Sequence, residues 1–322
     1  MRSMLCLLLT TVLCIAVPAL AQQPWPSRSL SLLTPFNPGP GPDLYLRPLM
    51  AKVSEQIGQV IVHDHRAGAG GALVLAQAAR AAPDGHTLVV ITNSNLIQRH
   101  LRPENTPDGV EFAHITRLSL APAVLVISAS APMQRLEDLV AAAKASPGKL
   151  NYGSGGNGTP SHLQGATLQA LTGIEAVHVP FKNANDVVPS LIRGDLHFAF
   201  QVMSFGAPFV RTGKLRLLAT TGATRARQFP DAPTLHELIK NDLAIQENWL
   251  GVAFPAKTPA AIVRRFYAEI MKALPDPVVQ KGMESSGTNS SPSESPEEYS
   301  TYVRRENDKW REIVKLSGIK VE

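Results

Sequence analysis

Cysteine is nearly absent from this chain. Its 322 residues include two cysteines, Cys6 and Cys14, and both lie within the first 21 residues. If that segment is removed on export, the mature protein contains no cysteine. Disulfides, thiolate catalysis and cysteine-bound metals are then excluded.

The first 21 residues have the pattern of an export signal. Arg2 is followed by an apolar stretch over residues 5–17, and Ala19-Leu20-Ala21 provides small residues around a cleavage point before Gln22. We therefore predict a signal peptide over residues 1–21, cleavage after Ala21, and a mature protein in the periplasm.

The chain also lacks basic clusters and later long apolar runs. Charged residues are only 18% of the sequence, and the net charge of +5 is spread along the chain. This pattern is not typical of a nucleic-acid surface, so we expect no nucleic-acid partner. After residue 21, no apolar stretch reaches the roughly 18 residues that indicate a membrane span. A hydrophobic fraction of 44% indicates a globular chain, long enough for two domains.

Short apolar runs alternate with helical patterns through most of the sequence. The expected strands are 30–33, 59–63, 87–91, 123–128, 150–152, 176–179, 196–200 and 215–220. The residues after 259 are expected to be helical. This alternation favours two α/β units with parallel sheets. Ligands bind such sheets beyond the carboxyl ends of their strands, so two facing units predict a cleft.

The segment Phe36 to Asp43 is rich in glycine and proline and lies between an expected strand and an expected helix. A helix that starts after such a loop presents free backbone N–H groups and a positive dipole end, which suit an anion. Asp43 also stands where an N-cap residue belongs. The alternative interpretation is therefore an ordinary capped helix.

A second glycine-rich segment runs from Gly153 to Thr159. Its Gly-x-Gly-x-x-Gly spacing matches the dinucleotide fingerprint, but the strand before it is short and Glu175 precedes the next strand. Ser154, Asn157 and Thr159 could instead offer donors to a carboxylate. A tight turn that requires glycine is the third interpretation.

Two further patterns suggest chemistry. Ser154 and Ser161, with His162 next to Ser161, raise the possibility of a serine hydrolase, but Tyr152 stands where a nucleophile elbow needs glycine. His63 and His65 point to the same side of an expected strand end, as metal ligands do. No third ligand follows at a recognisable spacing, so we predict no metal and no cofactor.

Many short motifs occur in a fixed order along the mature chain. They are Trp25-Pro26 with Arg28, Pro35-Phe36-x-Pro38-Gly39, 65–71, 82–88, 147–154, 156–159, 161–163, 178–182, 213–216 and Lys315-x-x-Gly318-Ile319-Lys320. Together they resemble the periplasmic substrate-binding proteins of tripartite tricarboxylate transporters, the Bug/TctC family. The resemblance covers essentially the whole mature chain.

The resemblance implies an α/β fold of the Venus flytrap type, with two lobes that each contain a mostly parallel sheet flanked by helices. Residues 22–121 and 251–322 would form lobe 1, and residues 122–250 lobe 2. It also implies a non-enzymatic monomer that captures a small organic carboxylate between its lobes. The ligand would be a mono-, di- or tricarboxylate or a related aromatic acid, delivered to a membrane transporter or a sensor kinase.

The resemblance also predicts which residues hold the ligand. They are Phe36, Asn37, Gly39, Gly41, Asp43, Thr92, Asn93, Ser94, Ser154, Gly155, Asn157, Gly158, Thr159, His162, Phe181 and Gln201. Pro40 and Pro42 depart from the family pattern and each removes an N–H donor from the first loop. Gln201 replaces an acidic residue of many members, which argues against an ammonium ligand.

Two alternatives remain open from the sequence. One is an exported hydrolase that uses the Ser154 loop. The other is a binding protein that has lost its ligand, since the two prolines change the first loop.

Overall fold

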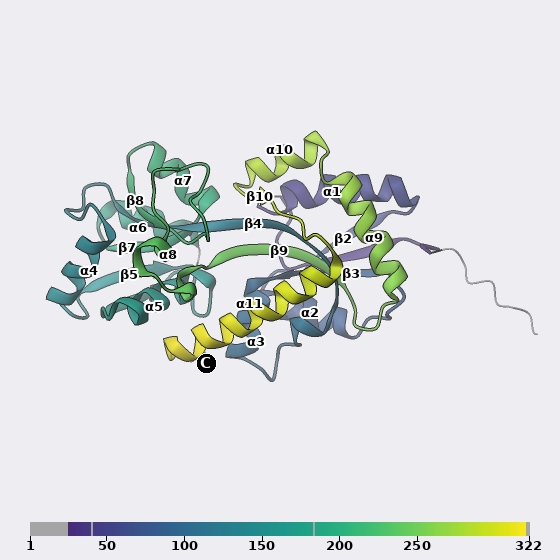
Figure 1. The fold of residues 1–322 in the computed structure, drawn as a ribbon, viewed down its shortest axis with the longest axis horizontal. Coiled ribbons are helices and arrows are strands. Elements are labelled where there is room, and N and C mark those ends of the chain that lie inside the picture. Colours follow the sequence, from purple (N-terminus) through teal and green to yellow (C-terminus); the bar gives the residue numbers. More distant parts are fainter. Residues whose placement is uncertain (1–24, 40, 183, 320–322) are drawn as a thin grey trace, which may run out of the picture.

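The structure is a computed structural model that describes residues 25–39, 41–182 and 184–319. The predicted signal peptide and Pro40 lie outside the described residues. The chain forms two lobes that are joined by two long strands running side by side (Figure 1). Among the described helices, none has the length and apolar character needed to cross a membrane.

The strands are β1 (Leu30–Thr34), β2 (Ile61–His65), β3 (Thr87–Thr92), β4 (Ala113–Ser128), β5 (Leu150–Ser154), β6 (Ala176–Pro180), β7 (Phe198–Val202), β8 (Leu215–Thr220), β9 (Glu247–Phe254) and β10 (Asn289–Ser290). The helices are α1 (Asp43–Ile57), α2 (Ala72–Ala79), α3 (Asn93–Leu101), α4 (Leu136–Ala145), α5 (Pro160–Thr172), α6 (Val187–Arg193), α7 (Met203–Arg211), α8 (Leu235–Ile239), α9 (Ala260–Ala273), α10 (Pro277–Ser285) and α11 (Pro296–Ser317).

Strand β4 belongs to both sheets. Its residues 113–122 pair with β9, and its residues 123–128 pair with β7 and β8. The sheet order β2-β1-β3-β9-β4-β7-β5-β6 therefore passes from one lobe to the other through this strand. The expected strand 123–128 is only the second half of β4, and β9 is not among the expected strands.

The two-lobed α/β fold is confirmed, but the sheets are mixed and not mostly parallel. Strands β1, β2 and β3 are mutually parallel, and so are β5, β6 and β7. Strands β4 and β9 instead run antiparallel to all their neighbours. They do so because the chain passes between the lobes along β4 and returns along β9.

Each sheet is covered on both faces. In the first lobe, α1, α9 and α10 pack on one face and α2, α3 and α11 on the other. Successive side chains of β1 point to opposite faces of the sheet. Leu32 therefore packs with the first group of helices and Leu33 with the second. In the second lobe, α4, α5 and α8 cover one face and α6 and α7 the other.

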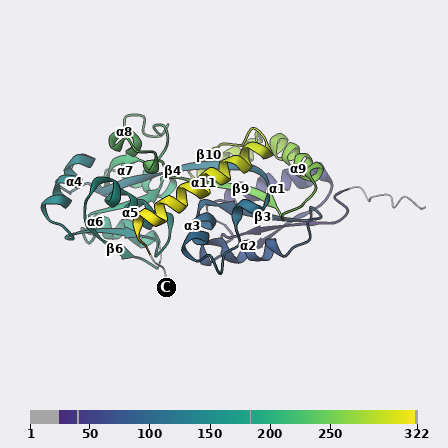
Figure 2. The same cartoon turned by 60° about the horizontal axis from the view of Figure 1, so that its bottom comes forward.

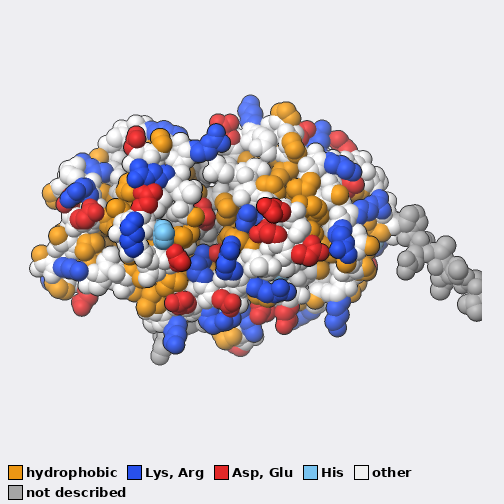
Figure 3. Space-filling view, in the orientation of Figure 1, with side chains coloured by type: hydrophobic (Ala, Val, Ile, Leu, Met, Phe, Trp, Pro, Cys, Tyr) orange, Lys and Arg blue, Asp and Glu red, His pale blue; other side chains and the backbone are white. Residues whose placement is uncertain are grey.

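The C-terminal helix α11 connects the lobes on one side of the molecule. It packs against β4 and α3 of the first lobe and also reaches α5 of the second (Figure 2). Leu163 of α5 accordingly shares a buried apolar cluster with Trp310 and Ile313 of α11. Lys and Arg side chains are scattered over both lobes in the view of Figure 3, interspersed with acidic ones.

Candidate functional site

A cavity of about 270 Å³ lies where the two lobes meet β4 and β9. Its walls combine three aromatic side chains with hydroxyl and amide groups. The lining residues are Phe36, Gly41, Pro42, Tyr45, Thr92, Asn93, Ser94, Ser119, Ala121, Val202, Ser204, Asn248, Trp249, Leu250, Ser286 and Thr288. None of these described lining residues carries a formal charge.

Three helices begin at this cavity. Gly41 and Pro42 precede α1, residues 92–94 start α3, and Val202 and Ser204 flank the first residue of α7. The first turn of a helix carries the positive end of the helix dipole. The first N–H groups of α1 and α3 are already bonded within the loop or the cap, and Asp43 places a carboxylate in the first turn of α1. The cavity therefore combines the starts of three helices with neutral hydroxyl and amide groups, which suits a small polar or anionic ligand.

The first loop is closed by its own aspartate. The Gly39 N–H donates to Asp43 Oδ2 at 2.9 Å, and Arg47 Nη2 donates to the same oxygen at 2.9 Å. Burial acts to raise the pKa of Asp43, but the Gly39 and Arg47 hydrogen bonds outweigh it and lower that pKa below its usual value. The Gly39 N–H is therefore engaged within the loop and not directed at the cavity.

The start of α3 is held by side-chain amides. Asn95 Oδ1 accepts from the Thr92 N–H at 2.7 Å, as in a capping box. Asn93 Nδ2 reaches Asn248 Oδ1 at 3.4 Å, and both residues line the cavity. This network links α3 to β9 and orients polar atoms before any ligand arrives.

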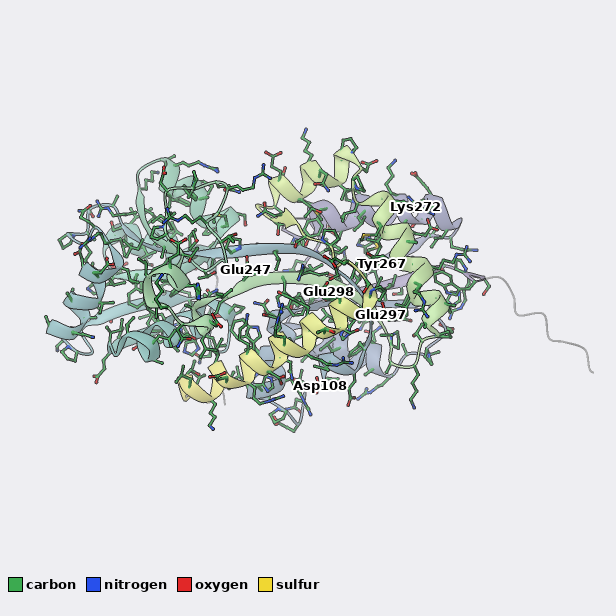
Figure 4. The ribbon with its side chains drawn as sticks, viewed as in Figure 1. Asp108, Glu247, Tyr267, Lys272, Glu297 and Glu298 are labelled. Atoms are coloured by element: carbon green, nitrogen blue, oxygen red, sulfur yellow. The ribbon has the colours of Figure 1, made fainter. Side chains whose placement is uncertain are left out.

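Trp249 is positioned from behind by the C-terminal helix. Its Nε1 donates to Glu306 Oε2 at 3.0 Å, and Glu306 also pairs with Lys309. Glu247, two residues earlier in β9, lies between the lobes (Figure 4), where burial raises the pKa of its carboxyl group. The wall formed by β9 thus depends on contacts with α11.

The second glycine-rich loop is organised by two histidines. Ser154 is fully buried, and its Oγ lies 2.6 Å from His178 Nε2. His178 stacks on His162 with ring centroids 3.6 Å apart, and His162 Nδ1 accepts from the Gly158 N–H at 3.1 Å. Burial lowers the pKa of each histidine to about 4, so both rings are neutral near pH 7.

This loop contacts the first lobe at α3. Gln98 Nε2 donates to the Gly158 carbonyl at 3.3 Å, one turn along from the α3 residues that line the cavity. Thr159 Oγ1 donates to the Gly156 carbonyl at 2.7 Å. The loop is therefore next to the cavity wall but outside the lining itself.

The structure brings part of the predicted residue set together. Phe36, Gly41, Thr92, Asn93 and Ser94 all line the cavity. The remaining predicted residues lie outside its lining: Asn37, Gly39, Asp43, Ser154, Gly155, Asn157, Gly158, Thr159, His162, Phe181 and Gln201. Their roles in ligand binding stay predictions.

Several lining residues are missing from the sequence-based set. Val202 directly follows Gln201 at the end of β7, and Ser204 comes two residues later in the first turn of α7, so the strand-end rule could have identified them. Ser286 and Thr288 come from the turn after α10, which no motif marks. Tyr45 of α1 and Ser119 of β4 also line the cavity, and their hydroxyl oxygens lie 3.0 Å apart.

Comparison with known proteins places this arrangement in a family. The family model described as "Tripartite tricarboxylate transporter family receptor" matches residues 46–319. A UPF0065 protein from the tcbD-tcbE intergenic region of Pseudomonas sp. strain P51 is 30% identical over 291 residues. That match covers 90% of this chain and 86% of the relative.

Solved structures show the same fold. MatC from Rhodopseudomonas palustris, with bound malate, is 25% identical with a TM-score of 0.74, covering 90% of this chain and 100% of that one. A second R. palustris protein, with adipate, is 26% identical with a TM-score of 0.77, covering 92% of this chain and 99% of that one. The resemblance noted from the sequence motifs is thus confirmed, and this chain belongs to the tripartite tricarboxylate transporter receptor family.

Proposed function

We propose that this protein is a periplasmic receptor that captures a small dicarboxylate in the cavity between its lobes and presents it to a transporter or sensor in the membrane. The observation that carries the proposal is the convergence of three helix N-termini on one cavity with an uncharged, hydroxyl- and amide-rich lining. Malate and adipate in the two R. palustris relatives support the same ligand class.

The cavity chemistry favours a carboxylate held by neutral donors. Hydrogen bonds to a charged group contribute about 1.5–3 kcal/mol each, so a few such contacts give useful affinity. The volume of about 270 Å³ is just below the roughly 300–1,000 Å³ of typical ligand pockets, which suits an acid of a few carbons. Phe36 and Trp249 would contact its carbon chain.

Binding would operate by lobe closure. We assign residues 22–121 and 251–322 to one lobe and 122–250 to the other, with hinges where β4 and β9 pass between them. Ser204 from the second lobe faces cavity residues from the first, so a ligand that contacts both stabilises the closed form. The loop 154–159 would complete the site from the α5 side, through its contact with Gln98.

Export, cleavage after Ala21 and a monomeric state belong to the same proposal. A binding role without catalysis is also part of it. Ser154 and His178 resemble a nucleophile and its base, but the serine hydroxyl is fully buried and also bonds to the Gly156 N–H at 3.1 Å. A substrate has no access to that oxygen in this arrangement.

A charge placed in the cavity tests the proposal. Isothermal titration calorimetry and thermal shift would compare succinate, malate, adipate, citrate, amino acids and nucleotides with the purified protein. We expect a dicarboxylate to raise the Tm by several degrees. Ser204→Asp should then weaken its binding at least tenfold, because like charges a few ångströms apart repel.

Two variants serve as controls for that substitution. Asparagine has nearly the same size as aspartate but no charge. Ser204→Asn should therefore bind the dicarboxylate within about threefold of the unmodified protein. Ser146→Asp adds the same charge on an exposed residue of the second lobe, after α4, and should leave affinity unchanged. If no carboxylate binds, or if Ser204→Asp binds as well as Ser204→Asn, the assignment is wrong.

A further inference from the structure

Asp43, His63 and His65 form a compact cluster beside the first loop, outside the cavity lining. His63 Nδ1 and His65 Nε2 each lie 3.8 Å from Asp43 Oδ1. All three atoms lie within 4.8 Å of one another. The two histidines share one face of β2, two residues apart, and the aspartate begins α1, so strand and helix together build the cluster.

These three atoms are buried and lack hydrogen-bond partners. The side chains of Asp43, His63 and His65 are only 5%, 8% and 15% exposed. Asp43 Oδ1, His63 Nδ1 and His65 Nε2 make no hydrogen bond among the described residues. A buried polar atom without a partner costs about 1–3 kcal/mol, so three such atoms facing one point call for a bound species.

The other polar atoms of the cluster are already engaged, which fixes the direction of the free ones. His65 Nδ1 lies 2.9 Å from the Phe36 carbonyl, so Nδ1 carries the proton and donates this hydrogen bond. His65 Nε2 is then unprotonated, and its lone pair is available to a metal ion. Asp43 Oδ2 accepts from Gly39 and Arg47, which leaves Oδ1 free. Histidine ligands of metals commonly have such a carbonyl partner on the second ring nitrogen.

We propose that Asp43, His63 and His65 bind a divalent transition-metal ion, for which Zn²⁺ is the best match. Two imidazoles and one carboxylate form a common zinc ligand set, with the fourth position left to water. Metal–ligand distances of about 2.0–2.2 Å require ligand atoms roughly 3.3 Å apart. The two distances from Asp43 Oδ1 would contract by about half an ångström from 3.8 Å, and the two histidine nitrogens, within 4.8 Å of each other, would also move together.

The charge of Arg47 opposes a cation at this cluster. The Arg47 side chain is 57% exposed and bonds to Asp43 Oδ2, not to the Oδ1 that faces the histidines, so solvent screens that repulsion. The ion would tie β2 to the loop whose far side, at Phe36 and Gly41, lines the cavity.

Metal analysis after equilibrium dialysis tests the site on purified protein without a histidine tag. We expect one Zn²⁺ per chain at micromolar free zinc, an increase in Tm, and no response to Mg²⁺ or Ca²⁺. Asp43→Asn, His63→Ala and His65→Ala should each weaken zinc binding at least tenfold. His236→Ala is the matched control, because His236 contacts one carboxylate, Asp242, at 3.1 Å and belongs to no three-ligand group among the described residues.

A second readout avoids variants that fold poorly. Co²⁺ added to the unmodified protein should give the visible absorption of a tetrahedral nitrogen–oxygen complex, and Zn²⁺ should remove it. The proposal is overturned if the unmodified protein binds no zinc at micromolar concentration, or if folded His63→Ala and His65→Ala bind it as tightly. Dicarboxylate calorimetry is measured separately, so failure of the metal site does not affect the carboxylate proposal.

Discussion

Gly287 lies directly against Ser204, although the two residues belong to different lobes. A Cβ atom on Gly287 would lie 2.8 Å from the Ser204 backbone nitrogen, closer than side chains approach backbone. Gly287 also has φ of +65°, in the left-handed region. Its neighbours Ser286 and Thr288 line the cavity together with Ser204, so this turn closes the cavity across the lobe boundary.

Gly287→Ala should therefore impair closure. The added methyl group pushes the turn away from α7, and we expect at least tenfold weaker ligand binding by calorimetry. A larger radius of gyration in solution scattering should accompany it in the presence of ligand. Gly58→Ala is the control, because Gly58 has φ of +70° with no atom within 4 Å of an added Cβ. Both variants should lose a similar amount of stability from backbone strain, and equal ligand affinity in the two would contradict the role of Gly287.

Glu306→Ala should lower the free energy of unfolding by roughly 3 kcal/mol. Glu306 is 5% exposed, and its carboxylate accepts from Trp249 Nε1 at 3.0 Å and Trp310 Nε1 at 3.3 Å. The substitution leaves both indole N–H groups without this acceptor and removes the ion-pair partner of Lys309, which keeps its hydrogen bond to the Ile245 carbonyl. Urea unfolding measures the loss.

The same substitution at Glu312, an exposed residue of α11, should change stability by less than about 0.5 kcal/mol. Because Trp249 forms part of the cavity wall, Glu306→Ala should also weaken ligand binding, whereas Glu312→Ala should not. A Glu306→Ala protein as stable as Glu312→Ala would show that α11 does not support the wall.

Stability should decrease as the pH falls from 6.5 toward 4. The pKa values of His162 and His178 are lowered to about 4 in the folded protein, from 6.5. Between these values the unfolded chain binds more protons than the folded one, so stability rises with pH and is lost on acidification. Thermal unfolding across this window should show a fall of several degrees.

His178→Gln tests the origin of that fall. It should flatten the pH dependence, because the stacked partner of His162 is removed while a hydrogen-bonding group remains near Ser154. A slope that persists in His178→Gln would assign the acid sensitivity to other groups.

The sequence predicted the parts of the site that depend on local order. A strand, a turn-forming loop and a helix start follow one another at Phe36–Asp43 and at Thr92–Ser94, so their place at the cavity follows from general rules. These rules do not predict the orientation of individual side chains. Asp43 accepts a hydrogen bond from the Gly39 N–H, and the Ser154 hydroxyl points to His178. Neither orientation can be read from the neighbouring sequence.

The cluster of Asp43, His63 and His65 shows the same limit at longer range. The spacing of His63 and His65 is visible in the sequence, but Asp43 lies 20 residues earlier and meets them only through tertiary structure. The parallel pairing of β1 with β2, with Leu32 opposite His63 and Thr34 opposite His65, sets this meeting. β2 also begins two residues later than expected, at Ile61, whose N–H bonds to Ser54 Oγ at 3.1 Å.

Strand β4 runs for 16 residues and completes both sheets, with Pro122 at the change of partners. Each lobe therefore depends on a strand that it shares with the other lobe. Separating the chain at Pro122 would leave each fragment with an open edge and an incomplete core. The receptor should accordingly melt in a single cooperative transition, and its halves should not be obtainable as independent soluble fragments.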